Sequence, residues 1–298
     1  MNVVPSMESA ARGIMFVLLS ACLFPVMDAI AKYLGDSYPI AEIVWARYVF
    51  HVLIVSALLL RTRVFHYLKT ARLGLQVSRA ALLMAATVLF FTALKFIPLA
   101  NAIAINFTAP FLVVGLSIPM LGERVGRVRW AVAVVGLLAV LVVIRPGFDD
   151  FRWASLLVVC SAACYALYQI VTRRIAAFDH PYTTLLYTGV LGALCSSVAA
   201  PFVWIAPSAR GWAFMIAIGA VGGLSQFFLI RAFHHAPASL LAPFSYVQIV
   251  VGTAISYLWF GDSPDRWTIV GAAIIVACGL ALAYRESRGT GDRERASV

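Results

Sequence analysis

The chain has few charged residues and none of the short motifs that mark the common enzyme classes. Only 12% of its 298 residues are charged, whereas 62% are hydrophobic. A water-soluble domain of this size needs more polar surface to cover its core, so the composition indicates a membrane protein. The sequence has no phosphate-binding Gly-Lys-Ser/Thr loop, no Gly-x-Ser-x-Gly elbow and no zinc-protease helix motif. We therefore expect neither an enzyme nor a protein driven by ATP hydrolysis.

Cysteine is also rare, and all five cysteines fall inside long apolar runs. A thiol within a bilayer behaves as a small apolar group and has no oxidising compartment in which to pair. We expect no disulfide. The pair His234-His235 has no further ligand nearby in the sequence, so we expect no metal and no cofactor.

Long apolar runs dominate what is present. A helix needs about 20 apolar residues to cross roughly 30 Å of hydrocarbon. The candidate spans are 13–34, 39–60, 78–97, 101–120, 127–145, 153–174, 181–204, 212–233, 239–260 and 266–284. The predicted fold is an all-α integral membrane protein with ten transmembrane helices and almost nothing left for a domain outside the membrane.

The net charge of +10 has a topological explanation. If both termini are cytoplasmic, the ten-span arrangement places sixteen basic residues, Arg79 among them, at the cytoplasmic side, six at the outer side and Arg47 within a span. This is the asymmetry that the positive-inside rule describes. We therefore expect cytoplasmic termini in a bacterial-type inner membrane, and no nucleic-acid partner.

The second half of the sequence repeats the first. At an offset of about 139 to 142 residues, ALKFIPLANAIAINFTAPFLVVGLSIPMLGERVGRVRW aligns with AFHHAPASLLAPFSYVQIVVGTAISYLWFGDSPDRW, and Gly122 meets Gly261. Each half has five spans, and because five is odd the second half must enter the membrane from the opposite side. The predicted organisation is a cytoplasmic N-terminus 1–12, a five-helix repeat 13–145, an inverted five-helix repeat 153–284 and a disordered cytoplasmic tail 285–298.

These features resemble one transporter family. Two five-helix halves, with APF…LGER in the first answered by APF…FGDS in the second, are similar to the drug/metabolite transporter superfamily in its EamA-type branch. Within that branch the sequence resembles the YddG-type exporters of aromatic and other amino acids, although the branch also includes transporters of S-adenosylmethionine and riboflavin. The resemblance covers essentially the whole chain and implies alternating access around a central cavity. Asp262 departs from the pattern, which usually has Glu at this position.

The fourth span contains a proline where a membrane helix is normally continuous. Pro110 has no N–H and leaves the carbonyl of Asn106 without its helical partner, which lipid cannot replace. Asn106 and Thr108 stand beside this position. We interpret Pro110 as a bend that faces the transport pathway, with a packing kink as the alternative. Pro25, in the middle of the first span, has the same interpretation.

Charged residues within the spans are few. Asp28 lies about six residues from the outer end of the first span and Arg47 about eight residues into the second from the same side, so both lie roughly 10 Å below the outer interface. Charges at this depth are costly and indicate function or pairing. Two interpretations stay open: a structural ion pair between Asp28 and Arg47, or contacts of these residues with a zwitterionic substrate, with proton exchange at Asp28.

Most other candidate residues near the expected midplane are aromatic or polar without charge, as in pockets for amphipathic small molecules. The alternative for each aromatic residue is packing against neighbouring helices or lipid. The predicted substrate-binding residues are Phe24, Asp28, Thr87, Phe90, Phe91, Asn106, Tyr165, Tyr168, Gln226, Ser245, Tyr246 and Gln248.

Gly219 and Gly223 have the four-residue spacing that lets membrane helices approach closely. We expect them to form a packing surface on the eighth span. A neighbouring helix could also slide along this surface when a gate moves. Together with Pro25 and Pro110, they are the predicted gating or bending positions.

We predict a secondary transporter that exports amino acids, aromatic ones included, with broad specificity. The alternative is a transporter or exchanger of another small metabolite such as S-adenosylmethionine, or a drug efflux protein. A sensor without transport activity is disfavoured because few residues remain outside the spans. The expected partners are a small-molecule substrate and the lipid bilayer. One chain with an internal pseudo-two-fold can enclose a pathway, so a monomer suffices and a dimer stays open.

Overall fold

The structure is a computed structural model that describes residues 7–59, 69–121, 126–145, 152–175, 178–236 and 238–295, and these residues are helical with short connections and no strand. In chain order the elements are α1 (Met7–Gly35), α2 (Ile40–Leu59), α3 (Leu73–Leu94), α4 (Leu99–Asn106), α5 (Ala109–Leu121), α6 (Arg127–Ile144), α7 (Ala154–Ile175), α8 (Pro181–Ala199), the 3₁₀ helix η3 (Ala200–Val203), α9 (Ala209–His235), α10 (Ala238–Ser245), α11 (Val247–Phe260) and α12 (Arg266–Arg295).

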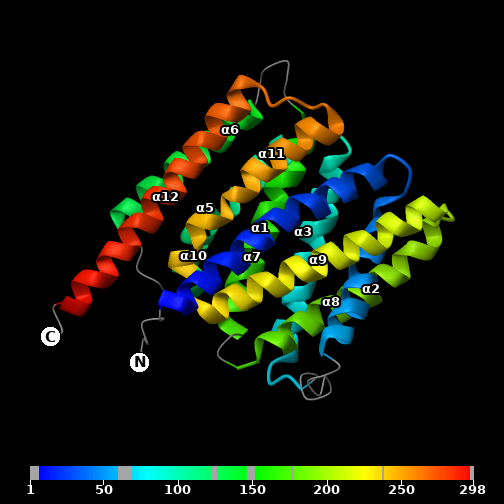
Figure 1. Ribbon diagram of the computed structural model, residues 1–298, viewed down its shortest axis with the longest axis horizontal. Helices are drawn as coiled ribbons and strands as arrows, with labels where there is room; N and C mark the ends of the chain where they lie inside the picture. The colour runs from blue at the N-terminus through cyan, green and yellow to red at the C-terminus, as the bar shows by residue number, and fades with distance from the viewer. Residues whose placement is uncertain are drawn as a thin grey trace.

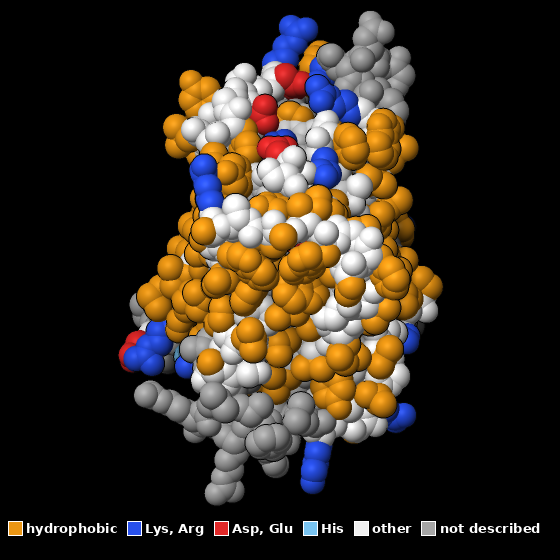
Figure 2. Space-filling view, turned by 90° about the vertical axis from the view of Figure 1, so that its right-hand side faces the viewer, with side chains coloured by type: hydrophobic (Ala, Val, Ile, Leu, Met, Phe, Trp, Pro, Cys, Tyr) orange, Lys and Arg blue, Asp and Glu red, His pale blue; other side chains and the backbone are white. Residues whose placement is uncertain are grey.

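These helices account for the ten expected spans. Seven described stretches are long and apolar enough to cross a bilayer, and the shorter apolar helices are Trp130–Ile144, Val247–Phe260 and Arg266–Ala281. On the surface, a broad apolar band separates charged side chains that gather toward the two ends (Figure 2). The chain is therefore a multi-pass membrane protein.

The last helix differs from the sequence expectation. The tail from 285 was expected to be disordered, but the backbone of α12 stays helical to Arg295. A helix that is already formed is extended residue by residue without a new nucleus, so polar residues can continue it beyond the apolar part.

Corresponding helices of the two halves make corresponding contacts. α1 packs along α9, and its counterpart α7 packs along α3; α11 contacts α1 as α5 contacts α7. α6 pairs with α12 at one edge of the molecule, and α2 pairs with α8 at the other (Figure 1). This is the packing of two inverted repeats, as the sequence predicted.

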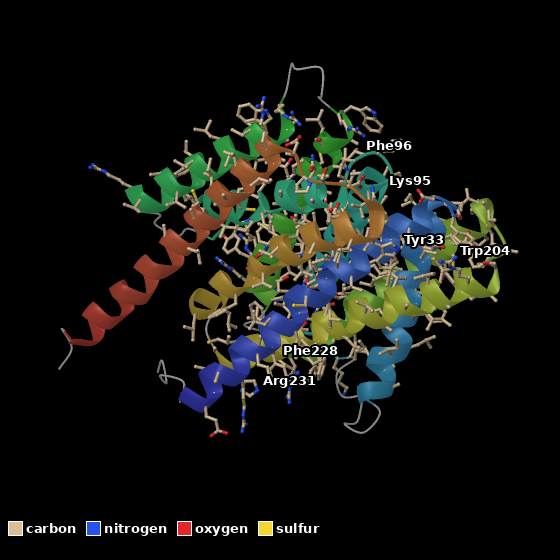
Figure 3. All side chains as sticks on the ribbon, turned by 45° about the horizontal axis from the view of Figure 1, so that its top comes forward. Tyr33, Lys95, Phe96, Trp204, Phe228 and Arg231 are labelled. Carbon is tan, nitrogen blue, oxygen red and sulfur yellow. The ribbon has the colours of Figure 1, made fainter. Side chains whose placement is uncertain are left out.

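Aromatic and basic side chains occupy both ends of the helix bundle, as is usual at membrane interfaces. Figure 3 shows Tyr33, Lys95, Phe96 and Trp204 toward one end, and Phe228 and Arg231 toward the other. We call the first end the outer end, because the charge distribution predicts that it faces away from the cytoplasm, and the second the inner end.

The fourth span consists of two helices. α4 ends at Asn106 and α5 begins at Ala109. Thr108 lies in the gap, and its N–H and hydroxyl both donate to the carbonyl of Ile105, at 2.9 and 2.5 Å. Pro110 is in the first turn of α5, where its missing N–H costs no helical hydrogen bond, and its side chain is exposed. The structure thus has a break where the sequence predicted a bend.

The ninth span is broken at the corresponding place. α10 ends at Ser245, and α11 begins after Tyr246. The ring of Tyr246 stacks on that of Phe107, which lies in the first break, with centroids 5.2 Å apart. The two breaks therefore meet inside the molecule. Gly261 ends α11 with a left-handed φ of 70°, whereas its counterpart Gly122 lies outside the described residues.

The fourth and ninth spans contact each other in their outer halves but not to the same extent in their inner halves. In the outer half α4 packs on α11, where the N–H of Ala100 donates to Ser256 Oγ at 3.3 Å and Gly252 lies against Ile103. In the inner half, α5 packs on α6 and α7 while α10 packs on α1 and α12, and the described parts of α5 and α10 form no comparable contact with each other. The two broken spans therefore pack on each other in the outer half but not in the described part of the inner half, where each packs on other helices.

Candidate functional site

Polar side chains from five helices meet between the two repeats. They come from α1, α2, α3, α7 and α9, the helices whose packing joins one repeat to the other. We call this group the central cluster: Asp28, Arg47, Tyr48, Arg79, Thr87, Tyr165, Tyr168 and Gln226.

Asp28 is the acidic member of the central cluster. It is 5% exposed on α1, and Arg47 on α2 is near enough to act on it electrostatically. Asp28 forms no ion pair or hydrogen bond with any described side chain. The direct Asp28 to Arg47 ion pair considered from the sequence is therefore absent, because Arg47 is directed to other partners.

Arg47 is held by neutral groups. Its Nη1 donates to Thr87 Oγ1 at 2.5 Å, and its guanidinium lies 5.4 Å from the ring of Tyr48 and 5.3 Å from the ring of Phe91. Thr87 donates its own proton to the carbonyl of Leu83 at 2.8 Å, which leaves its oxygen free to accept from Arg47. Cation–π contacts of this kind stabilise a desolvated guanidinium without neutralising it.

Arg79 is the cluster member that the sequence analysis assigned to the cytoplasmic side. It lies in the second turn of α3 and is only 4% exposed. Its Nη2 donates to the hydroxyl of Tyr168 at 2.5 Å, an oxygen to which Gln226 Nε2 also donates at 3.3 Å. The available signal was the polar pair Gln76 and Arg79, which are three residues apart on one helix face and both buried.

Tyr165 and Tyr168 lie one turn apart on α7, and their rings stack at 5.4 Å. Tyr168 is buried and Tyr165 is half-buried. With Phe91, they give the central cluster aromatic surfaces next to its charged groups.

Four predicted residues lie at the helix breaks rather than in the central cluster. Asn106 ends α4, and its buried Oδ1 accepts no hydrogen bond in the described structure. Ser245 ends α10, Tyr246 stacks on Phe107, and Gln248 lies half-buried in the first turn of α11.

The remaining predicted residues on α1 and α3 belong to the apolar core. Phe90 is buried and Phe24 is half-buried, and both pack into the main core. Pro25 lies inside the continuous helix α1, with its Cβ 3.7 Å from the position that a Cβ would take at Gly252 of α11. Pro25 therefore contacts the outer half of the broken ninth span but does not break its own helix.

Gly219 and Gly223 bring α9 close to α2. A Cβ at Gly219 would overlap Phe50, and a Cβ at Gly223 would lie 3.5 Å from Nδ1 of His51. His51 is itself buried at this contact, with 8% of its surface exposed. The spacing of the two glycines thus positions α2, and with it Arg47, against α9.

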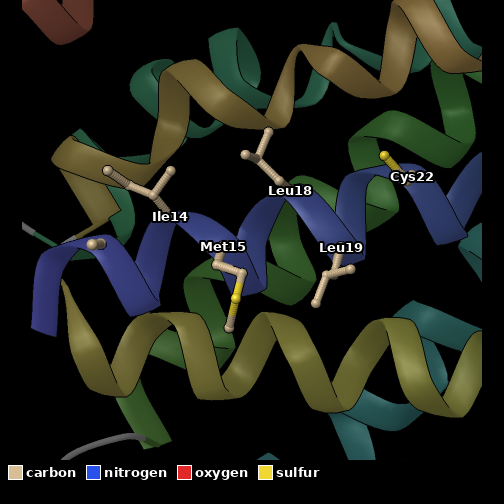
Figure 4. Close-up of a pocket in the computed structure, with 6 residues that line it drawn as sticks. Ile14, Met15, Leu18, Leu19 and Cys22 are labelled. Atoms are coloured by element: carbon tan, nitrogen blue, oxygen red, sulfur yellow. The ribbon is translucent and has the colours of Figure 1, made fainter. Parts of the chain in front are cut away.

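A surface hollow of about 360 Å³ lies away from the central cluster. It is lined by one face of α1: Ala11, Ile14, Met15, Leu18, Leu19 and Cys22 (Figure 4). All these groups are apolar or weakly polar, so nothing there orients a polar ligand. Among the described residues no group of three His, Cys, Asp or Glu side chains is placed to hold a metal ion.

The sequence was compared with known protein families. The family model described as the EamA-like transporter family matches twice, over residues 11–145 and 152–285, which are the two repeats. The chain belongs to the EamA-like transporter family.

Individual relatives of this EamA-like transporter cover nearly its full length. An S-adenosylmethionine uptake transporter from Rickettsia prowazekii is 28% identical over 95% of this chain and 96% of its own. The pseudopaline exporter CntI from Pseudomonas aeruginosa is 30% identical over 91% and 95%. A riboflavin transporter from Vibrio cholerae is 26% identical over 89% and 90%.

One solved crystal structure is similar to this fold with a TM-score of 0.65, at 22% identity over 95% of this chain and 98% of that one. It supports the fold alone. The family and the relatives together support transport of a small molecule by this EamA-like transporter.

Proposed function

We propose that this EamA-like transporter carries small zwitterionic metabolites with an α-amino-acid group, aromatic amino acids included, by alternating access through the central cluster. In this proposal the direction is export across the inner membrane. A single chain is sufficient, because both repeats that enclose the cluster belong to it.

The observation that carries the proposal is the buried carboxylate of Asp28, which pairs with no described side chain. An isolated charge in a low-dielectric site costs several kcal/mol unless a partner compensates it. Arg47 acts on it only at longer range. A substrate ammonium group would supply the missing close partner, and intramembrane carboxylates are commonly retained for such a role.

Arg47 complements Asp28 at the other end of an amino-acid group. Its Nη1 binds Thr87, which accounts for one of the five N–H donors of a guanidinium and leaves others for a carboxylate. The rings of Tyr48 and Phe91 beside Arg47 would contact an aromatic or other large apolar side chain.

The unequal closure of the two ends supports alternating access. α4 packs on α11 at the outer end, whereas the described parts of α5 and α10 form no comparable contact at the inner end. In the proposed cycle this is the state that receives a cytoplasmic substrate, and the inverted repeat supplies the opposite state by exchanging the two packings.

A second candidate substrate is S-adenosylmethionine. The matching uptake transporter covers 95% of this chain, and this molecule also has an α-amino-acid group, attached to a sulfonium and an adenine ring. The central cluster has aromatic surfaces for such a ring, so the two candidates differ in substrate and direction rather than in site.

The test uses purified protein in liposomes loaded with labelled phenylalanine or labelled S-adenosylmethionine. Efflux is followed against unlabelled amino acids, S-adenosylmethionine and riboflavin. Asp28→Asn is compared with Asp36→Asn, which removes an exposed carboxylate just beyond the outer end of α1. We expect Asp28→Asn to raise KM by at least ~10-fold and Asp36→Asn to leave it unchanged.

The outcomes separate the candidates. Saturable efflux of phenylalanine inhibited by other amino acids supports the first substrate class, and efflux of S-adenosylmethionine alone supports the second. Transport of riboflavin only, or unchanged kinetics in a folded Asp28→Asn variant, contradicts the proposed role of the α-amino-acid group.

A further inference from the structure

Arg79 is a buried cation whose hydrogen-bond partners are all neutral. Its Nε donates to Thr172 Oγ1 at 2.7 Å, its Nη1 donates to the carbonyl of Thr184 at 3.0 Å and to the hydroxyl of Thr188, and its Nη2 donates to Tyr168 at 2.5 Å. The guanidinium also lies 4.4 Å from the ring centre of Tyr168. These contacts use four of its five N–H donors but do not neutralise its charge.

The acidic residue bound to Gln76, one turn from Arg79 on α3, is directed to other partners. Asp179 accepts hydrogen bonds from Thr70, Ala71 and Gln76. No ion pair joins Arg79 to any acidic residue in the described ranges. No described acidic residue therefore balances the charge of Arg79.

Arg79 and Arg47 both act electrostatically on the same part of the central cluster. Tyr48 and Tyr165 each lie within electrostatic range of both guanidinium groups. In the central cluster, one carboxylate, Asp28, is thus accompanied by two guanidinium groups. A buried site with surplus positive charge favours ligands that bring negative charge and disfavours cations.

We infer that Arg79 is a specificity-determining residue that selects, through the surplus positive charge of the central cluster, substrates with a free carboxylate and no net positive charge. The inference rests on the proposed function and narrows its substrate class. A neutral zwitterion or an anion is carried in preference to a cation of the same shape. Tyr168 connects Arg79 to the rest of the central cluster. Arg79 donates a hydrogen bond to the hydroxyl of Tyr168, and the ring of Tyr168 stacks on that of Tyr165.

This inference bears directly on the two candidate substrates. S-adenosylmethionine has a sulfonium and therefore one positive charge more than S-adenosylhomocysteine, which has nearly the same shape. Phenylalanine amide has one positive charge more than phenylalanine. The S-adenosyl pair differs mainly in charge, whereas phenylalanine amide also lacks the carboxylate that we propose Arg47 binds. The part of each ratio that is lost in Arg79→Gln therefore reports the selectivity that we assign to Arg79.

The experiment measures inhibition constants for both pairs in reconstituted wild-type protein, with labelled phenylalanine as tracer, or labelled S-adenosylmethionine if phenylalanine is not carried. In the wild type, the more cationic member of each pair should bind at least about tenfold more weakly, since one unit charge at roughly 12 Å and an effective dielectric constant of ~20 accounts for a factor of about ten. Arg79→Gln should reduce the ratio of the S-adenosyl pair to about 1–3 and should lower that of the phenylalanine pair by a similar factor.

A second variant leaves Arg79 itself unchanged and alters one of its hydrogen-bond partners. Thr172→Asp places a carboxylate at the Nε of Arg79 and neutralises it, so it should lower the ratio as Arg79→Gln does. Thr172→Asn, of the same shape without the charge, should keep the wild-type ratio, and so should Arg231→Gln, which removes an exposed charge at the inner end (Figure 3). These variants keep the test decisive if Arg79→Gln does not fold.

A merely structural role for Arg79 would change yield or move all inhibition constants together. A wild-type ratio near one, or a ratio unchanged in folded Thr172→Asp, overturns the inference while α-amino-acid transport stands. Failure of all four ligands to bind the wild type overturns the proposed function and this inference with it.

Discussion

Lys32 Nζ lies 3.9 Å from Asp262 Oδ2 and so connects α1 of the first repeat to the loop after α11 of the second. The same ammonium donates to the carbonyls of Leu94 and Ile97, at 3.2 and 3.0 Å, where α3 ends. One side chain thus joins three segments that meet at the closed outer end.

Removal of this contact should make the outer end open more often. We expect Lys32→Met to increase the rate at which a cysteine at Ser256, on the closed face of α11, reacts with a membrane-impermeant thiol reagent in a background without native cysteines. The increase should be about fivefold, equivalent to about 1 kcal/mol for a partly exposed ion pair. Lys95→Met removes an exposed charge at the same end and should not change the rate. Equal rates in Lys32→Met and wild type would contradict a closing role for Lys32.

The break in the fourth span should matter more for transport than for stability. Pro110→Ala restores an N–H where α4 and α5 meet and allows the two short helices to join. We expect the transport rate to fall several-fold while the melting temperature in detergent changes little, because Pro110 is exposed and fills no core space. Pro119→Ala, farther along α5, is the matched control. An unchanged rate in Pro110→Ala would show that the break needs only Thr108.

Close packing of α9 on α2 should be sensitive to a single methyl group. Gly219→Ala places a Cβ against Phe50 and the backbone of His51, and we expect a loss of about 1–3 kcal/mol of stability. Gly115→Ala is the control, because a Cβ there meets nothing within 4 Å. Thermal unfolding in detergent measures both variants, and equal melting temperatures would contradict the close contact.

Stability should depend on pH through Asp179, which lies outside the spans. Burial alone raises its pKa, but hydrogen bonds from Thr70, Ala71 and Gln76 outweigh burial and lower the pKa below its usual value. A depressed carboxylate pKa stabilises the fold above the pKa of the unfolded chain, and this contribution is lost as the pH falls through the folded-state pKa. Asp179→Asn should therefore lower the melting temperature at neutral pH, and the difference from wild type should shrink below about pH 4.

The control for this effect is Asp36→Asn, an exposed carboxylate at the outer end. Its melting temperature should follow that of the wild type at every pH. A difference between wild type and Asp179→Asn that stays constant as the pH is lowered would show that the lost hydrogen bonds matter and the charge does not.

Several features of the site were predictable because they depend on nearby residues. Thr87, Tyr165, Tyr168 and Gln226 stand at mid-span in polar or aromatic positions, and the structure brings all four into the central cluster. Arg79 was missed because its position near a span end is normal for a cytoplasmic charge. Its partners on α7 and α8 are between 89 and 109 positions away along the chain, which no local pattern reveals.

By itself, the sequence determined the number of spans, the inverted repeat and the position of the break before Pro110. Those properties follow from apolar length, from internal similarity and from a missing N–H, all of which are local. The tertiary structure decided that Asp28 has no direct partner among the described side chains, that Arg79 is buried among neutral groups and that the two broken spans pack together at the outer end. These depend on which helices pack together, and the energy of a buried charge is set by the neighbours that such packing supplies.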